Sequence, residues 1–275
     1  MNIIKNIFTR IILLIIWFSF VSLLFTIVDF FSSDSTSSSN KTTSKTIKKE
    51  VKADKIISNY TYWYDFYNNY YNANLEISRN AYYKSIRNKE NNYASTIGAL
   101  YRVIYNSDKL DLNLVYKELD FIRRDRSLSK RRFAEIVVSM VQNIPYNIIV
   151  QESCSLAQIR NDSVNEMILR GYECEGNVYA GVYSPLEFVK KMKGDCDSRT
   201  LFIYTVLKKF NYDVVILNSD LYAHSIIGLN IPSSGRYKYY NGKRYYTWET
   251  TAKGYELGVL PADFSNIDYW YIALT

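Results

Sequence analysis

Near Phe210 the apolar pattern of the chain changes from a helical period to a strand-like one. Before this point apolar residues recur at intervals of three and four, as on one face of a helix. After it come two apolar runs, 213–219 and 223–231, which are typical of buried strands. Helices followed by strands, without alternation between the two, predict an α+β fold with an antiparallel sheet.

Two helices are predicted early in this region, over residues 111–126 and 129–142, and Pro145 ends the second. We expect residues 56–135 to form a mainly helical segment. Within it, the tyrosine-rich stretch 60–71 is interpreted as a packing surface, and a ligand platform is the less favoured alternative. The remaining residues are assigned to a second domain, 136–275.

The sequence predicts that a helix starts after Ser184, because a serine N-cap is followed by proline at the first position and by glutamate three residues after the cap. This short helix leads through Gly194 into a second one, at about 196–210. The second helix has a buried stripe of Ile203, Val206, Leu207 and Phe210. Further on, residues 238–249 predict a hairpin around an Asn-Gly turn.

The N-terminal region has a different character. Ile11–Val28 is a run of 18 residues without a charge, which as a helix covers about 27 Å, close to the thickness of the hydrocarbon core. No small-residue cleavage site follows it, so residues 1–31 predict an uncleaved transmembrane anchor. The low-complexity Ser/Thr/Lys stretch 32–55 predicts a flexible linker. The expected location is a single-pass membrane protein whose catalytic domain lies outside the cytoplasm, although lysines after the apolar run weaken the charge asymmetry.

The net charge of +7 comes mostly from the first 55 residues. The remaining chain is close to balanced, which argues against a nucleic-acid partner. A single histidine and the lack of a close CxxC pair argue against a metal site, and no cofactor is expected.

The chain has three cysteines, Cys154, Cys174 and Cys196. In an exported domain the redox setting allows a disulfide, and the first two cysteines are expected to form it. This pairing leaves one odd thiol. That thiol, Cys196, stands in the sequence GDCDSRT at the predicted start of a helix.

A cysteine at a helix N-terminus is exposed to the positive end of the helix dipole, which favours the thiolate. Its backbone amide points to where an oxyanion forms, and Gly194 leaves room for a substrate backbone. The flanking carboxylates of Asp195 and Asp197 oppose thiolate formation. A basic partner for Cys196 is therefore needed.

His224 is the one imidazole available to Cys196, and it opens a predicted strand. A thiol–imidazole pair needs a third group to hold the ring. Glu249 ends the strand-like run YYTWE, and antiparallel pairing would bring it to His224. Asp220 and Asp263 are the alternative acids.

The order of cysteine at a helix start, histidine opening a strand and acid closing a tryptophan-containing strand resembles the transglutaminase-like superfamily, which has a papain-like fold. The resemblance covers roughly residues 138–252, and Val141–Tyr146 is similar to a segment that often precedes the domain in bacterial members. The family commonly has aspartate at the third position, in a W-x-x-D-P-T-like context. Here the sequence is W-E-T-T-A, with glutamate.

The resemblance implies a cysteine hydrolase, a protease or amidase that acts on a protein or peptide through an acyl-thioester. Cys196 would be the nucleophile and His224 first the base and then the acid. Gln142 is a candidate second oxyanion donor, with a structural role as the alternative. A non-catalytic binding or scaffold module and an amine-accepting transglutaminase remain open as alternative functions.

Overall fold

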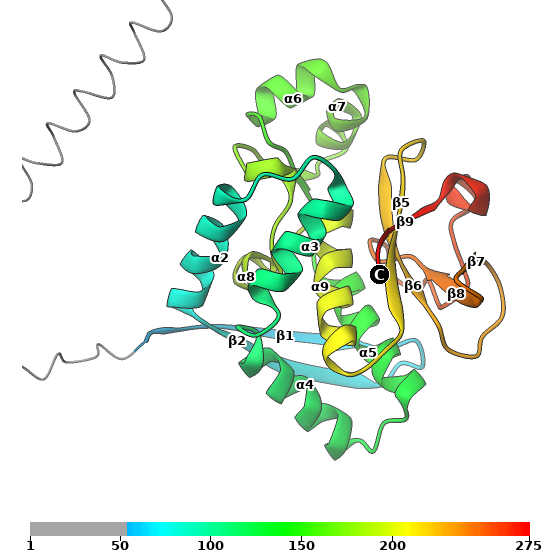
Figure 1. Cartoon of the computed structure of the whole chain (residues 1–275). Coiled ribbons are helices and arrows are strands. Elements are labelled where there is room, and N and C mark those ends of the chain that lie inside the picture. Colours follow the sequence, from blue (N-terminus) through cyan, green and yellow to red (C-terminus); the bar gives the residue numbers. More distant parts are fainter. Residues whose placement is uncertain (1–53) are drawn as a thin grey trace, which may run out of the picture. The chain divides into compact units, whose positions relative to one another are not determined.

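The computed structural model describes residues 54–275 (Figure 1). The predicted anchor, 1–31, and nearly all of the predicted linker, 32–55, lie outside the described residues. Within 54–275, no helix has the length and apolar character needed to cross a membrane. This region combines helices with an antiparallel sheet, so the predicted α+β class is confirmed.

The described chain opens with a β-hairpin, which the sequence analysis did not predict. Strands β1 (Ile56–Tyr64) and β2 (Tyr70–Ser78) pair antiparallel. One face buries Trp63 and Tyr71. The other face is exposed and carries Tyr60, Tyr62, Tyr64 and Tyr70. Aromatic residues occupy both faces here, so the period of two that marks a strand is hidden in the sequence.

Helices follow the hairpin. They are α2 (Arg79–Asn91), α3 (Ile97–Asp108), α4 (Asn113–Asp125) and α5 (Lys130–Asn143). The prediction of a mainly helical segment is thus wrong for the hairpin and holds for the helices, and α4 and α5 match the two predicted helices to within two residues. Ser129 caps α5, because its hydroxyl accepts a hydrogen bond from the Arg132 amide at 3.3 Å.

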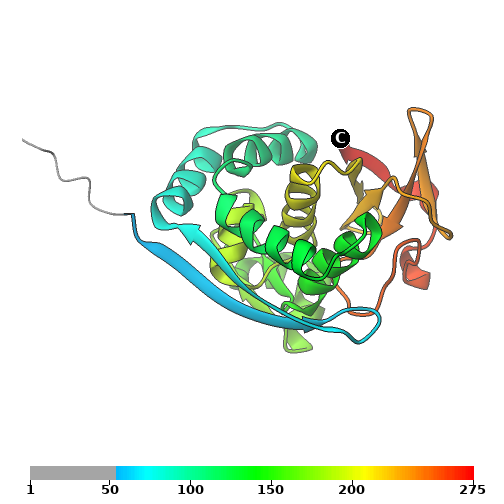
Figure 2. The same cartoon turned by 90° about the horizontal axis from the view of Figure 1, so that it is seen from below.

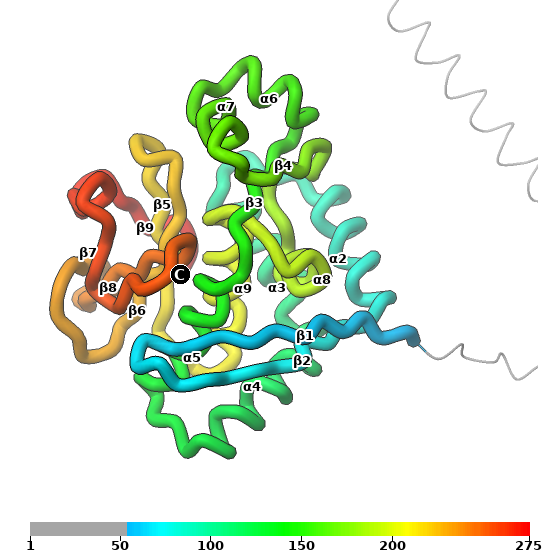
Figure 3. Tube along the Cα trace, turned by 180° about the vertical axis from the view of Figure 1, so that it is seen from behind, coloured from blue at the N-terminus to red at the C-terminus, as the bar shows by residue number. Residues whose placement is uncertain are grey.

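A small lobe follows α5, built from β3 (Asn147–Ile149), α6 (Cys154–Arg160), α7 (Asp162–Leu169) and β4 (Glu173–Glu175). Strands β3 and β4 pair in parallel. The predicted disulfide between Cys154 and Cys174 is present, with the two Cα atoms 6.1 Å apart. Helix α6 begins at Cys154, and α7 follows it before Cys174. Figure 3 shows α6 and α7 at the opposite end of the described region from the β1–β2 hairpin.

The next two helices are α8 (Pro185–Lys191) and α9 (Cys196–Lys209). The predicted capping box is confirmed at α8. Ser184 Oγ accepts from the Glu187 amide at 3.2 Å, and a Glu187 carboxylate oxygen accepts from the Ser184 amide at 2.8 Å. Helix α9 starts at Cys196, as predicted.

Five strands form the main sheet. They are β5 (Val214–Ser219), β6 (His224–Leu229), β7 (Tyr237–Tyr240), β8 (Lys243–Trp248) and β9 (Tyr271–Leu274). Their spatial order is β7-β8-β6-β5-β9, and all pairs are antiparallel. Asn241 and Gly242 both have positive φ, as the tight hairpin turn between β7 and β8 requires. The edge strand β9 was not predicted.

Helix α9 is central to this arrangement, because it packs on β5 and β6 with one side and on α3, α5 and α8 with the other (Figures 1 and 2). Nearly all of its side chains are buried. Its N-terminal part reaches β6 directly, since Thr200 Oγ1 donates to the Ser225 carbonyl at 3.2 Å. The start of α9 and the start of β6 therefore meet.

Candidate active site

Cys196 is the first residue of α9 and is only 8% exposed. The N-cap is Asp195, whose Oδ1 accepts from the Ser198 amide at 2.9 Å. Gly194 is required here because a Cβ at this position would lie 2.9 Å from the Phe188 ring. The expected role of Gly194 in leaving room for a substrate thus has a plainer explanation, which is the close packing of α8 on this loop.

His224 and Glu249 are brought together by strand pairing. His224 opens β6 and Glu249 directly follows β8, and these antiparallel neighbours pair with Ile227 opposite Trp248. His224 Nε2 lies 2.9 Å from Glu249 Oε2. This bond leaves the other ring nitrogen, Nδ1, for a second partner.

The Glu249 carboxylate is buried and fully engaged. Its Oε1 accepts from the Thr250 amide at 2.8 Å and from the Thr251 amide and hydroxyl at 2.6 and 2.7 Å. Burial alone would raise the pKa of Glu249, but the hydrogen bond and charge of His224, together with the Thr251 bonds, outweigh it and lower the pKa to about 2. The acid therefore stays ionised beside the imidazole.

Ser225 connects this pair to the cysteine. Its backbone N–H faces the Cys196 sulfur and lowers the pKa of the thiol, so the residue directly after His224 lies against Cys196. The His224 ring is held in place by Phe264, with ring centroids 5.2 Å apart, and by Trp270 at 6.0 Å. The start of β6 thus carries the imidazole and a contact to the Cys196 sulfur on the consecutive residues His224 and Ser225.

The electrostatics at Cys196 differ from the expectation based on the helix dipole. Burial raises the pKa of the Cys196 thiol, the charges of Asp197 and Asp195 raise it further, and the Ser225 amide lowers it. Asp195 is itself affected, because burial and the charge of Asp197 raise its pKa to about 8. The neutral thiol is therefore the favoured resting form.

Gln142 does not act as the second oxyanion donor in this conformation. Its Nε2 donates to the carbonyls of Glu249 at 2.8 Å and Tyr255 at 2.9 Å. Both amide hydrogens are used, so the structural role is the one observed. The alternative acids do not take the place of Glu249, since the His224 ring bonds to Glu249, Asp220 accepts from the Tyr271 hydroxyl at 2.9 Å, and Asp263 lies in a short 3-10 helix beside Phe264.

Arg199 holds the cysteine loop, a role that sequence reasoning missed. It is fully buried and donates only to backbone carbonyls, namely those of Gly194 at 2.8 Å and of Val141 and Ile144 at 2.6 Å each. Burial lowers its pKa to about 10. The C-terminal end of α5 is thereby tied to the turn before Cys196. An arginine inside the GDCDSRT motif was the available signal, but arginine in a first helical turn is usually exposed.

A buried group of four polar residues was also missed. Tyr101 Oη donates to Asp197 Oδ1 at 2.6 Å and lies 3.0 Å from Ser225 Oγ. Ser225 Oγ donates to the same Asp197 oxygen, and Asn218 Nδ2 donates to Tyr101 Oη at 3.2 Å. We call Tyr101, Asp197, Asn218 and Ser225 the Asp197 clasp. They come from α3, α9, β5 and β6, and no sequence motif links them.

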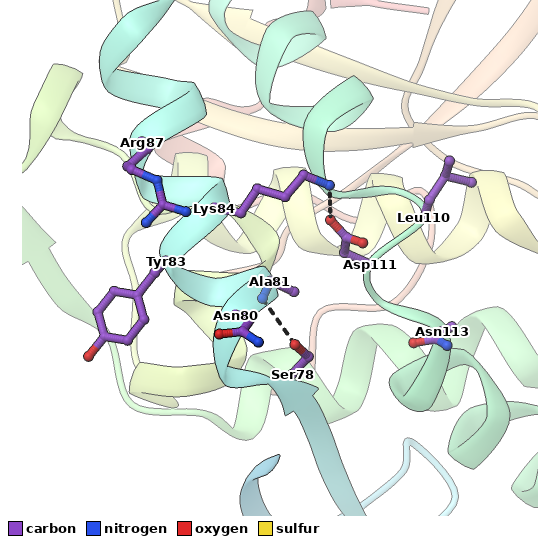
Figure 4. Close-up of a pocket in the computed structure, with 9 residues that line it drawn as sticks. All are labelled: Ser78, Asn80, Ala81, Tyr83, Lys84, Arg87, Leu110, Asp111 and Asn113. Carbon is purple, nitrogen blue, oxygen red and sulfur yellow. Dashed lines mark hydrogen bonds and ion pairs between the residues drawn. The ribbon is translucent and has the colours of Figure 1, made fainter. Parts of the chain in front are cut away.

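A surface pocket of about 670 Å³ lies elsewhere, at the start of α2 (Figure 4). Lys84 crosses it to pair with Asp111 at 2.8 Å. Cys196, His224 and Glu249 are not among the residues that line it. In residues 54–275, no group of three His, Cys, Asp or Glu side chains is arranged to hold a metal ion.

Comparison of the chain with models of protein families, with characterised proteins and with solved structures gives no significant match.

Proposed function

We propose that residues 136–275 form a transglutaminase-like cysteine hydrolase, a protease or amidase that cleaves an amide bond in a protein or peptide. The observation that carries the proposal is the His224–Glu249 bond of 2.9 Å, one residue from the Ser225 amide that contacts the Cys196 sulfur. A thiol, an imidazole and a buried carboxylate in this order are the parts of a nucleophilic triad.

In the first step Nδ1 of His224 takes the thiol proton while the Cys196 sulfur attacks the carbonyl carbon of the substrate. Because the resting thiol is favoured, this proton transfer accompanies the attack. The negative charge on the carbonyl oxygen is stabilised by the backbone N–H of Cys196, which as the first residue of α9 has no partner within the helix.

Collapse of the tetrahedral intermediate breaks the C–N bond, and His224 returns the proton to the leaving amine. An acyl-thioester remains on Cys196. Water, deprotonated by His224, then attacks the thioester and releases the acid and the thiol. Glu249 stays ionised and stabilises the imidazolium in both half-reactions.

The proposed location is outside the cytoplasm, with residues 11–28 as a membrane anchor. The Cys154–Cys174 disulfide supports an oxidising compartment. Attack by an amine in place of water is the same chemistry with another acceptor.

A non-catalytic binding module is the second candidate. It is favoured by one observation, the burial and the neighbouring carboxylates that raise the thiol pKa of Cys196. The two candidates differ in whether the native thiol reacts faster than an ordinary one.

The test is capture by a peptide that carries a thiol-reactive group. The native protein is expected to be labelled once, at Cys196, faster than glutathione at the same pH, and the matched Cys196→Ser variant is expected to remain unlabelled. Labelling no faster than glutathione, or equal after denaturation, would favour the binding module.

A further inference from the structure

The Asp197 clasp joins the two residues that directly follow the proposed nucleophile and base. Asp197 follows Cys196, and Ser225 follows His224. The side chain of Ser225 bonds to Asp197 Oδ1, and its backbone N–H faces the Cys196 sulfur. Ser225, a single residue of β6, therefore contacts both Cys196 and Asp197.

Tyr101 completes this connection from a third element. It is fully buried on α3, and its hydroxyl reaches both Asp197 and Ser225. Asn218 Nδ2 donates to the Tyr101 oxygen, so the Tyr101 proton is left to point toward Asp197 Oδ1. The direction of the hydrogen bond to Asp197 is thereby fixed.

We propose that the Asp197 clasp positions Cys196 against His224, with Asp197 and Tyr101 as positioning residues of the site. The inference rests on the proposed cysteine hydrolase function. Cys196 lies on helix α9 and His224 on strand β6. A small shift of one element relative to the other would change the distance over which the proton moves from thiol to imidazole. Hydrogen bonds from two hydroxyls to one carboxylate oxygen hold the two element starts in register.

The clasp has a second effect, on the charge of the nucleophile. Cys196 Sγ lies 3.9 Å from Asp197 Oδ1, so the neutral thiol points at an acceptor. The hydroxyl protons of Tyr101 and Ser225 offset part of the charge on this oxygen. The other titratable groups facing the pair are Asp195, Glu249, Tyr146, Arg199 and Tyr271, besides His224.

These two effects are separable by substitution. Asp197→Asn removes the charge but keeps an acceptor oxygen of the same reach, whereas Asp197→Ala removes both. Tyr101→Phe keeps the charge and removes one donor. The matched control is Tyr105→Phe, one turn along the same helix, whose ring packs on Tyr204.

The experiment measures two quantities on the full chain. The first is the rate of alkylation by iodoacetamide against pH, which reports Cys196 alone, because the other two cysteines form the disulfide. The second is turnover of a peptide amide. Alkylation needs no substrate, so it tests the clasp even if the peptide is not turned over.

Both Asp197 variants are expected to move the alkylation midpoint to lower pH, because one negative charge beside the thiolate is lost. Tyr101→Phe is expected to move it to higher pH. Turnover is expected to fall about tenfold or more in Asp197→Ala and Tyr101→Phe and to be largely retained in Asp197→Asn. Tyr105→Phe should match the wild type in both measurements.

An alkylation profile that is unchanged in Asp197→Asn and Tyr101→Phe overturns the inference, as does turnover in Asp197→Ala within twofold of the wild type. If Tyr101→Phe does not fold, Ser225→Ala replaces it, since it removes the other donor and keeps the backbone N–H on the sulfur. A wild type without thiol-dependent turnover contradicts the hydrolase function instead, and the alkylation profile then decides the clasp alone.

Discussion

His224 Nε2 and Glu249 Oε2 lie 2.9 Å apart at the shared end of β6 and β8, although 25 residues separate them along the chain. Antiparallel pairing accounts for this, because it runs the start of β6 alongside the end of β8, with Ile227 opposite Trp248. The carboxylate is anchored by three further bonds from Thr250 and Thr251. The orientation of the imidazole ring is therefore set from the sheet, independently of any substrate.

Glu249→Gln is expected to slow peptide-probe labelling and turnover by roughly 100-fold or more, because a neutral amide no longer stabilises the imidazolium. Rates of labelling at pH 7 measure this. The graded control is Glu249→Asp, which restores the charge but shortens the reach between His224 and Thr251, so an intermediate rate is expected. A Glu249→Gln rate equal to that of the wild type would remove Glu249 from the triad.

The same carboxylate predicts an acid-dependent loss of stability. Its pKa is lowered from 4.5 to about 2 in the folded protein, so its contribution to stability is present above about pH 4.5 and is lost as the pH falls toward 2. Thermal unfolding of the wild type and Glu249→Gln at pH 7, 4 and 3 checks this. The destabilisation caused by the substitution should be largest at pH 7 and shrink below pH 4; an undiminished difference at pH 3 would contradict the assignment.

Asp195→Asn is expected to show the opposite pH dependence. The folded-state pKa of Asp195 is raised from 3.8 to about 8, so its contribution to stability is present below about pH 3.8 and is lost as the pH rises through 8. Asparagine caps a helix equally well and does not titrate. Chemical unfolding at pH 5, 7 and 9 measures this. The free energy of unfolding of the variant should rise relative to that of the wild type as the pH increases to about 8. A constant difference across this range would mean that Asp195 is ionised throughout.

Gly194→Ala is expected to destabilise the protein by about 1–3 kcal/mol, because the new methyl group meets the Phe188 ring. Denaturant unfolding measures the loss. A second change, Phe188→Leu, opens space on the α8 side and should cost less in the Gly194→Ala background than in the wild type. Additive effects of the two changes would mean that the glycine is needed for another reason.

Replacement of both Cys154 and Cys174 by serine is expected to lower stability by roughly 3 kcal/mol, the cost of opening a loop of this length. The melting temperature and the labelling rate at Cys196 should both be followed. Because the disulfide lies outside the proposed triad, labelling of the folded variant is expected to stay near the wild-type rate. A loss of labelling without a loss of stability would assign the lobe a direct part in the site.

The sequence by itself determined the features that depend on near neighbours in the chain. The capping box at Ser184 and Glu187, the helix that begins at Cys196 and the Asn-Gly turn between β7 and β8 are all local, since each is satisfied within a few residues. The pairing of Cys154 with Cys174 was predicted from the exported context and from setting Cys196 aside as the nucleophile, which leaves two cysteines. The sequence also singled out Cys196, His224 and Glu249 as candidate site residues, since each stands at the start or end of a predicted helix or strand.

Only the tertiary structure decided what depends on distant contacts. The β1–β2 hairpin carries aromatic residues on both faces. Trp63 is buried and Tyr62 is exposed because helices α4 and α5 pack on one face of the hairpin only. The side-chain amide of Gln142 donates to two backbone carbonyls that lie far away in the chain. The Tyr101 hydroxyl of α3 donates to Asp197, which is 96 residues away in the sequence. The thiol pKa of Cys196 follows the same rule, because desolvation depends on everything packed around the sulfur and outweighs the local field of its own helix.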